Sequence, residues 1–191
     1  TPEEEYQDYL QRYLSSAEHV QKLCDRYPEL VRVTEQVMEQ AEAFLQEFLQ
    51  RFENDHRKIA EEICPGVEHV GIRSLGLKAG DPHNGGRSTF RVQLENGVWL
   101  YYKPHSIRKK ALYQTLYNRI SKSLGLSCLP APYLDCGAYG WEAEIVSRGC
   151  DTVAEVQSYY YRMGIHLFLG YVLTASDLHG ENLIACGEYP M

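Results

Sequence analysis

Residues 87–103 read RSTFRVQLENGVWLYYK, and this stretch decides the fold. Two runs with the period-two pattern of a strand flank Glu95, Asn96 and Gly97. Asn-Gly between such runs is the strongest short-range signal for a β-hairpin, because both central positions of a type I′ turn need a positive φ angle. We therefore predict an antiparallel pair of strands with Lys103 at the end of the second one.

A helical period precedes the hairpin. Residues 3 to about 64 predict helix, because apolar side chains recur at steps of three and four and so share one stripe. We expect one long helix after one or two shorter ones, with Pro28 in its first turn and Pro65 beyond its end. The segment VEHVGIRSLGL, from residue 67, then predicts a further strand. The stripe of the long helix consists of Leu30, Val33, Val37, Ala41, Phe44, Phe48 and Phe52.

Further elements follow the hairpin. Ser106 is the predicted N-cap of a helix that Gly125 closes. A strand pair follows in PYLDCGAY and WEAEIV, with its predicted turn at Gly140. A last long helix begins after Asp151 or Thr152 and ends near residue 173. Helices grouped around short antiparallel strands predict an α+β fold.

Composition and charge limit the possible partners. The 191 residues contain 19 Lys and Arg against 26 Asp and Glu, a net charge of −7 that argues against nucleic acid as the main partner. None of the six cysteines stands in a C-x-x-C pair, so a zinc knuckle or redox motif has no support. We find no secretory leader and no apolar run of about 20 residues that predicts a transmembrane segment. A cytoplasmic protein with free thiols is the expectation.

The stretch TASDLHGENL, residues 174–183, gathers polar groups after an apolar segment. Asp177 and Asn182 have the spacing of a phosphotransferase catalytic loop, with His179 between them. In such a loop the Asp orients or accepts the proton of an attacking hydroxyl, and the Asn amide oxygen holds Mg²⁺. The alternative is a helix C-terminus whose polar side chains satisfy the backbone of a loop.

The order of the other elements favours the catalytic interpretation. A phosphotransferase needs a lysine on its third strand to neutralise the phosphates of ATP, and Lys103 holds that place. It also needs a glycine-bearing loop between its first two strands, where GLKAGDPHNGGRS stands. We therefore predict a kinase-like arrangement with Lys103, Arg87, Gly85 and Gly86 at the nucleotide.

The glycine-bearing loop also contains Asp81 and His83. A loop that only covers a nucleotide has no need for a carboxylate that faces phosphate, because like charges repel. His exchanges protons near neutrality and Asp can fix its tautomer, so the pair suggests a second task in acid–base chemistry. An Asx-turn beside a solvated histidine is the alternative.

Four stretches carry a resemblance to a known family. GDPHNGGRSTF, the hairpin ending in YYKP, YGWEAEIV and ASDLHGENLIACGEYP resemble the dehydratase domain of class II lanthipeptide (lantibiotic) synthetases of the LanM type, over residues 27 to the end. Members of that family resemble lipid kinases in their core. They phosphorylate Ser and Thr of a ribosomal precursor peptide with ATP and then eliminate phosphate to leave dehydroamino acids. A separate C-terminal zinc cyclase adds cysteine thiols to the alkenes.

The resemblance implies a role for each matching residue. Lys103 matches the nucleotide-phosphate lysine, Asp177 the catalytic carboxylate and Asn182 a magnesium ligand, with His179 next to them in the loop. The remaining matches are Asp81 and His83, the pair tied to phosphate elimination. The implied cofactors are ATP and Mg²⁺, and the implied partner is a precursor peptide with a leader and a Ser/Thr-rich core.

The chain also departs from the family pattern. The helix after Lys103 offers no Glu to pair with the lysine, so Gln114, Asn118 or a partner elsewhere must take that role. The second metal-binding Asp is expected beyond Met191, and the cyclase is expected in a longer parent protein. We expect the fragment by itself to have little or no turnover. It would also expose apolar residues of the last long helix, among them Leu167, Phe168 and Tyr171.

The resemblance divides the α+β chain into three parts. These are a helical subdomain (1–65), a kinase-like N-lobe of antiparallel sheet plus helix (66–150), and the first helix and catalytic loop of an incomplete C-lobe (151–191). Two alternatives remain: a fragment of a small-molecule kinase of the aminoglycoside type, whose catalytic loop SDLHGENL also resembles, and a non-catalytic peptide-binding module.

Overall fold

The computed structural model describes residues 1–14, 16–67, 70–76, 86–175, 180 and 182–191. The chain divides into two compact units. The first contains Thr1–Arg51 and His83–Arg87, and the second contains Phe52–Pro82 and Ser88–Met191.

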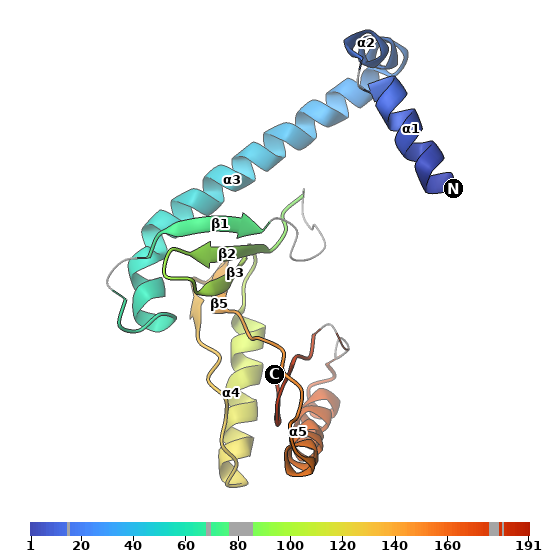
Figure 1. The fold of residues 1–191 in the computed structure, drawn as a ribbon. Helices are drawn as coiled ribbons and strands as arrows, with labels where there is room; N and C mark the ends of the chain where they lie inside the picture. The colour runs from blue at the N-terminus through green and yellow to red at the C-terminus, as the bar shows by residue number, and fades with distance from the viewer. Residues whose placement is uncertain (15, 68–69, 77–85, 176–179, 181) are drawn as a thin grey trace. The chain divides into compact units, whose positions relative to one another are not determined.

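The helices predicted over residues 3 to about 64 form, and the first unit contains most of them. It contains α1 (Pro2–Leu14), α2 (Ala17–Arg26) and most of α3 (Pro28–Glu62), and Figure 1 shows α3 as one continuous helix. Pro28 begins α3, because its fixed φ angle suits a first turn whose N–H has no helical partner. The apolar stripe is buried only in part. Phe44 and Phe48 are buried, whereas the earlier members Leu30, Val33 and Val37 are exposed.

An antiparallel sheet forms the centre of the second unit. Its strands are β1 (Ile72–Gly76), β2 (Phe90–Leu94), β3 (Trp99–Lys103), β4 (Tyr133–Asp135) and β5 (Gly140–Ala143). The spatial order is β1-β2-β3-β5-β4, and each neighbouring pair is antiparallel. Helices with an antiparallel sheet confirm the α+β class.

Strand alternation gives the sheet one apolar face and one polar face. The buried side chains of the apolar face include Val92, Leu100 and Trp141. The C-terminal part of α3 packs there, where the Phe52 ring lies 5.8 Å from the Trp141 ring in an edge-on arrangement. Trp141 Nε1 also donates to the buried Asp55 carboxylate at 2.9 Å. The polar face carries Arg91, Tyr101, Lys103, Glu142 and Glu144.

The β2–β3 hairpin forms as predicted, but the predicted turn type is wrong. Gly97 has a φ of 87°, whereas Asn96 stays outside the left-handed region. Gly97 N donates to Leu94 O at 2.9 Å, and Leu94 N donates to Val98 O at 2.8 Å. The connection is therefore a three-residue loop that needs one left-handed glycine, not two left-handed positions.

The turn between β4 and β5 also lies elsewhere than predicted. Gly137 has the positive φ, 82°, and Cys136 N donates to Tyr139 O at 3.0 Å. Gly140 is the first residue of β5 and pairs with Lys103. Gly137 N also donates to the Asp135 carboxylate at 2.8 Å, a local bond that stabilises the turn at Gly137.

Helix α4 (Arg108–Ser123) begins one residue later than an N-cap at Ser106 predicts. Its N-cap is Ile107, with no side-chain cap bond, so the prediction for Ser106 is wrong. Gly125 follows the last turn with a φ of 73°, which confirms the predicted end.

Helix α5 (Val153–Val172) packs on α4, and two short strands, β6 (Ala185–Cys186) and β7 (Tyr189–Pro190), follow it. Tyr117, Ile165 and Leu169 form the buried core of this part. Thr152 caps α5 by accepting from Glu155 N, one of the two predicted cap residues.

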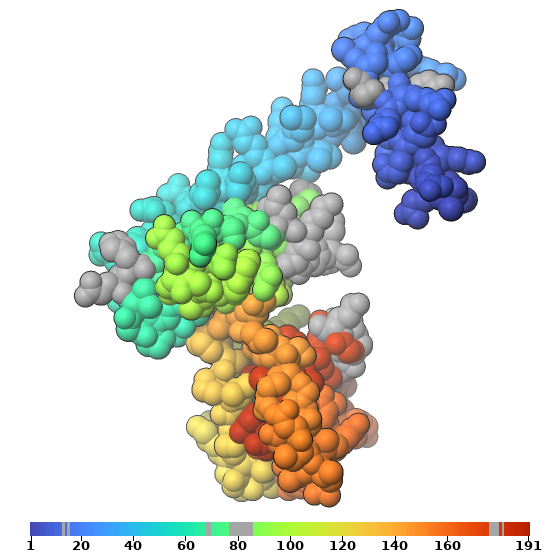
Figure 2. Space-filling view, viewed as in Figure 1, coloured from blue at the N-terminus to red at the C-terminus, as the bar shows by residue number. Residues whose placement is uncertain are grey.

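Part of the α5 surface is apolar. Leu167, Phe168 and Tyr171 are 76%, 56% and 86% exposed, as predicted, and Figure 2 shows α5 in orange at the surface. Within the described ranges, no helix has the length and apolar character that crossing a membrane requires.

Candidate functional site

Strand β3 places Lys103 on the polar face of the sheet. Leu100 and Tyr102 are completely buried on the opposite face, so alternation puts Tyr101 and Lys103 together on the polar one. The Lys103 ammonium lies 5.8 Å from the centre of the Tyr101 ring, and the residue is half-buried. The prediction that Lys103 ends this strand is confirmed.

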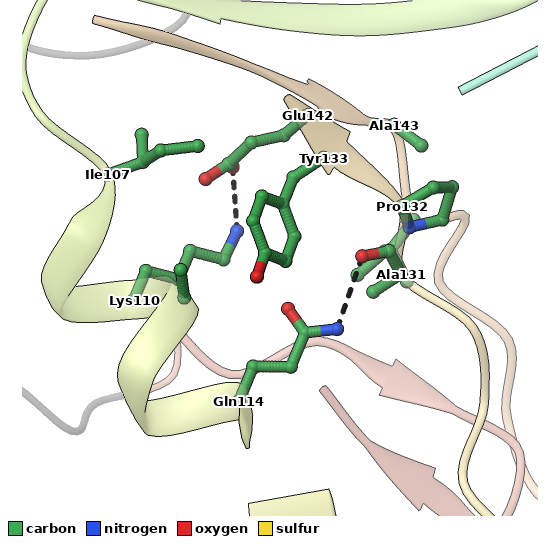
Figure 3. Close-up of a pocket in the computed structure, with 10 residues that line it drawn as sticks. Ile107, Lys110, Gln114, Ala131, Pro132, Tyr133, Glu142 and Ala143 are labelled. Carbon is green, nitrogen blue, oxygen red and sulfur yellow. Dashed lines mark hydrogen bonds and ion pairs between the residues drawn. The ribbon is translucent and has the colours of Figure 1, made fainter. Parts of the chain in front are cut away.

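Strand β5 brings Glu142 to the same place. Glu142 lies opposite Tyr101 in the β3–β5 ladder, and Gly140 lies opposite Lys103. Glu142 is therefore a diagonal neighbour of Lys103 on one face, at a spacing that long side chains can bridge. The Glu142 side chain is only 8% exposed and accepts from Lys110 Nζ at 2.6 Å, as Figure 3 shows.

A glycine explains how α4 approaches β5 closely enough for this ion pair. A Cβ atom at Gly140 would overlap the Ile107 side chain and come within 3.0 Å of Leu134 O. Without that atom, Ile107 packs against the strand and is only 4% exposed. Helix α4 begins at the next residue, and its first turn carries Lys110.

A small pocket lies beside this ion pair, between α4 and the β4–β5 strands (Figure 3). Its volume is about 10 Å³, enough for about one water molecule. Gln114 Nε2 donates across it to Ala131 O at 3.1 Å. A pocket of this size cannot hold a nucleotide. The Gln114 side chain bonds to the backbone, so it does not serve as the partner of Lys103.

The surroundings of Lys103 shift its pKa in opposite directions. Burial lowers the pKa of Lys103, the Glu142 carboxylate raises it, and the Lys110 ammonium lowers it again. The Glu142 carboxylate forms its ion pair with Lys110, at 2.6 Å. A half-buried ammonium of this kind is suited to an anion such as phosphate.

A second charged cluster lies farther along the same face. Arg91 donates to both Glu144 oxygens, at 2.7 and 2.9 Å, and the Tyr101 hydroxyl donates to Glu144 at 3.1 Å. The Arg91 guanidinium lies 3.9 Å from the centre of the Trp99 ring. The hydrogen bonds from Arg91 lower the pKa of Glu144, and burial raises the pKa of Tyr101.

Sequence analysis missed Glu142 and Glu144. The segment WEAEIV was assigned only as a strand, although its alternation places the two acids on one face and Trp141 with Ala143 on the other. Two basic residues of the first turn of α4 also pair with acids of the β4–β5 strands: Lys110 with Glu142, and Arg108 with Asp135 at 3.6 Å. The sequence signal for these two acids was their alternation with apolar residues, beginning with the aromatic Trp141.

Most of the other predicted site residues lie outside the described residues. These are Asp81, His83, Gly85, Asp177 and His179. Gly86 is described and has a φ of 87°. Arg87, in the first unit, forms an ion pair with Glu47, with one contact at 2.9 Å. Asn182 lies exposed in the turn before β6.

The chain on both sides of the 176–181 segment is anchored to α5. Arg162, buried on α5, donates to Glu188 at 3.2 Å and lies 4.4 Å from the Tyr189 ring centre. His166, also buried on α5, has its Nε2 3.0 Å from Pro190 O. The β6–β7 hairpin is therefore held by the helix that precedes the predicted catalytic loop in the sequence.

No group of three or more His, Cys, Asp or Glu side chains is placed to hold a metal ion among the residues that the structure describes. The predicted magnesium ligand Asn182 is an amide, and the predicted carboxylate beside it, Asp177, falls outside those residues.

Comparisons with known proteins give two matches. The model of the family described as "Domain of unknown function (DUF4135)" matches residues 27–191. The chain is also 26% identical over 204 residues to the "Lacticin 481/lactococcin biosynthesis protein LcnDR2" of Lactococcus lactis subsp. lactis. That match covers 100% of this chain and 21% of the relative, so the chain spans about a fifth of the relative's length. Together the matches confirm the resemblance to LanM-type synthetases that the motifs indicated.

Proposed function

Because the chain belongs to the family described as "Domain of unknown function (DUF4135)", we propose that it is part of an ATP-dependent lanthipeptide synthetase. Its parent protein phosphorylates Ser and Thr of a precursor peptide and then eliminates phosphate to form dehydroamino acids. The observation that carries the proposal is the position of Lys103, a half-buried ammonium at the end of the third strand, in a chain whose sequence continues with D-x-H-x-x-N after α5. The name of the lactococcal relative supports the same pathway class.

Each residue of the proposed site has a separate task. Lys103 binds and orients the phosphates through its half-buried ammonium. Asp177 accepts or orients the proton of the Ser or Thr hydroxyl, and the Asn182 amide oxygen holds Mg²⁺. Asp81 and His83 serve elimination, in which a base takes the α-proton of the phosphorylated residue and the phosphate leaves. ATP supplies the phosphoryl group when it is bound.

The fragment is proposed to work within a longer protein. The parent would carry the second magnesium carboxylate and a C-terminal cyclase domain, and we place it in the cytoplasm, where ATP and reduced thiols are available. All six cysteines of this chain are free thiols, which agrees with such a compartment.

The test uses the full-length parent protein with ATP, Mg²⁺ and its precursor peptide. We expect mass spectrometry to show loss of water from the wild-type product, and Lys103→Met to slow the reaction by ~100-fold or more, as removal of one charge-stabilising donor does. Asp81→Ala or His83→Ala should accumulate phosphorylated peptide. A normal rate of alkene formation in both variants would remove them from the elimination step.

Two other results would replace the proposal. A small molecule that gains phosphate, with an unmodified peptide, would indicate a kinase of the aminoglycoside type. Calorimetry that shows peptide binding without magnesium-dependent ATP affinity would indicate a peptide-binding module.

A further inference from the structure

Lys103 has no acidic partner on the helix that follows it. Helix α4 contains no Glu or Asp between Arg108 and Ser123, and Gln114 donates to the Ala131 carbonyl. In protein kinases, a glutamate on the corresponding helix orients the strand lysine. We propose that Glu142, on strand β5, is the positioning residue that orients Lys103 toward the nucleotide phosphates. This inference rests on the proposed function.

The register of the sheet carries the argument. Glu142 and Lys103 lie on one face of adjacent antiparallel strands, offset by two positions, because Tyr101 pairs with Glu142 and Lys103 with Gly140. A diagonal pair of this kind lies within reach of two long side chains. Gly140 has no side chain that could stand between them. Strand pairing therefore fixes the separation, whereas a helix-borne acid would depend on how the helix docks.

Burial shows why the acid is held in place. The Glu142 side chain is 8% exposed, and a carboxylate so deeply placed needs cationic partners. Lys110 on α4, whose side chain is 57% exposed, is one such partner. Lys103, half-buried on the sheet itself, is the second cation near it. The carboxylate thus pairs with an exposed lysine of α4, and its strand position is diagonal to that of the lysine proposed to bind phosphate.

A simpler role for Glu142 would be to pin α4 to the sheet through Lys110. The two roles predict different results for the variants Glu142→Gln and Lys110→Met. If Glu142 only pins α4, then Glu142→Gln and Lys110→Met break the same ion pair and have the same effect. If Glu142 orients Lys103, only its own substitution disturbs the nucleotide.

Kinetics of the full-length parent protein separate these roles. We expect Glu142→Gln to raise the KM for ATP and lower kcat/KM by ~10-fold or more, the loss typical for one hydrogen bond between charged groups. Glu142→Asp should recover part of the loss, and Lys110→Met should change the KM for ATP much less than Glu142→Gln does. Equal effects of Glu142→Gln and Lys110→Met would overturn the proposal.

A readout without turnover follows from the charges around Lys103. Among the residues that the structure describes, the groups that act on its amine are Tyr101 on β3, Glu142 on β5 and Lys110 on α4. The rate at which Lys103 is acylated, followed by peptide mass spectrometry across pH, reports the pKa of that amine. Glu142→Gln removes an anion and should lower this pKa, whereas Lys110→Met removes a cation and should raise it. An unchanged profile in the Glu142→Gln protein would contradict the proposal.

Failure of this inference can be told apart from failure of the proposed function. If Lys103→Met leaves ATP-dependent dehydration intact, the proposed function fails. If Lys103→Met abolishes dehydration while Glu142→Gln behaves as wild type, the proposed function stands and only the role of Glu142 is wrong.

Discussion

Thr174, directly after the C-cap residue of α5, has a backbone conformation that is normally found at glycine. Its φ is 51°, in the left-handed region, where a β-branched side chain is strained. Thr174 N donates to Tyr171 O at 3.3 Å and Ala175 N donates to Gly170 O at 2.9 Å, the two bonds of a Schellman motif. The strained residue lies directly before the predicted catalytic loop.

Replacing Thr174 with glycine should relieve this strain. We expect Thr174→Gly to raise the free energy of unfolding by ~1 kcal/mol. A left-handed non-glycine residue costs about 1–2 kcal/mol, and the larger entropy that glycine loses on folding offsets part of the gain. Urea denaturation measures the change. Thr174→Ala is the control, because alanine keeps the Cβ atom that causes the strain. An equal gain in both variants would show that the threonine side chain, not the backbone angle, is responsible.

Gly140 illustrates the opposite situation, in which glycine is required by a neighbour rather than by a φ angle. Its added Cβ would overlap Ile107, which is buried. We expect Gly140→Ala to lower the free energy of unfolding by ~1–3 kcal/mol, the usual cost of overpacking. In a double-mutant cycle with Ile107→Val, the combined loss should be smaller than the sum of the single losses. Additive losses would mean that the two side chains do not collide.

Asp55 connects two elements that are far apart in the sequence. It lies on α3 and accepts from Trp141 Nε1 of β5 at 2.9 Å, while the Cys136 thiol of the β4–β5 turn lies 3.4 Å away. Burial, together with the Asp55 charge, raises the pKa of Cys136 to about 11. One buried carboxylate therefore holds the helix, the strand and the turn together.

Loss of this carboxylate should loosen α3 from the sheet. We expect Asp55→Ala to lower the free energy of unfolding by ~2–4 kcal/mol, because buried donors are left without an acceptor. Asp55→Asn keeps the volume and one acceptor oxygen, so its loss should be smaller. Thermal or urea unfolding gives both values. A larger loss for asparagine than for alanine would mean that the hydrogen bonds are not what Asp55 contributes.

At the level of elements, local signals predicted most of the fold. Pro28, Gly125 and Thr152 mark the ends of helices, and the strand periodicity located β2 and β3, because all of these depend on near neighbours in the chain. The β4–β5 turn and the start of α4 were misplaced. The turn lies at Gly137, whereas the missing Cβ atom of Gly140 leaves room for Ile107, a tertiary contact that no local pattern contains.

For the whole molecule, the sequence predicted the kind of site better than its geometry. Motif order led to the family, and Lys103 ends its strand as expected. The position of Glu142 near Lys103 depends on which strands pair, and β5 joins β3 although a helix and a strand lie between them in the sequence. Several motif residues, such as Asp81 and Asp177, lie outside the described residues, so their roles stay predictions.

His166 makes the stability of the packed α4, α5 and β7 elements depend on pH. Its Nε2 lies 3.0 Å from Pro190 O, which can only accept, so Nε2–H donates there and Nδ1 accepts from the Tyr113 hydroxyl at 2.9 Å. The ring also stacks on Tyr117, with centroids 4.4 Å apart. Both hydrogen bonds suit a neutral imidazole, and burial lowers the pKa of His166 below 6.5.

The sign of the pH effect follows from this lowered pKa. Above pH ~6.5 His166 is neutral in the folded and unfolded states, so its contribution is complete. As the pH falls below that value, the unfolded chain binds a proton first, and stability decreases until the pH reaches the lowered pKa of the folded state. We expect the free energy of unfolding to fall in this window by at most ~1.4 kcal/mol per pH unit from His166, the limit for one proton.

His166→Gln is the matched variant, because glutamine can donate to Pro190 O and accept from Tyr113 but does not titrate. The difference in unfolding free energy between wild type and variant, measured by urea denaturation from pH 7.5 to 5, should shift against the wild type as the pH falls. Below the pKa of the folded state the difference should become constant. A difference that is independent of pH, or that shifts in favour of the wild type on acidification, would show that His166 is not held neutral by its burial on α5.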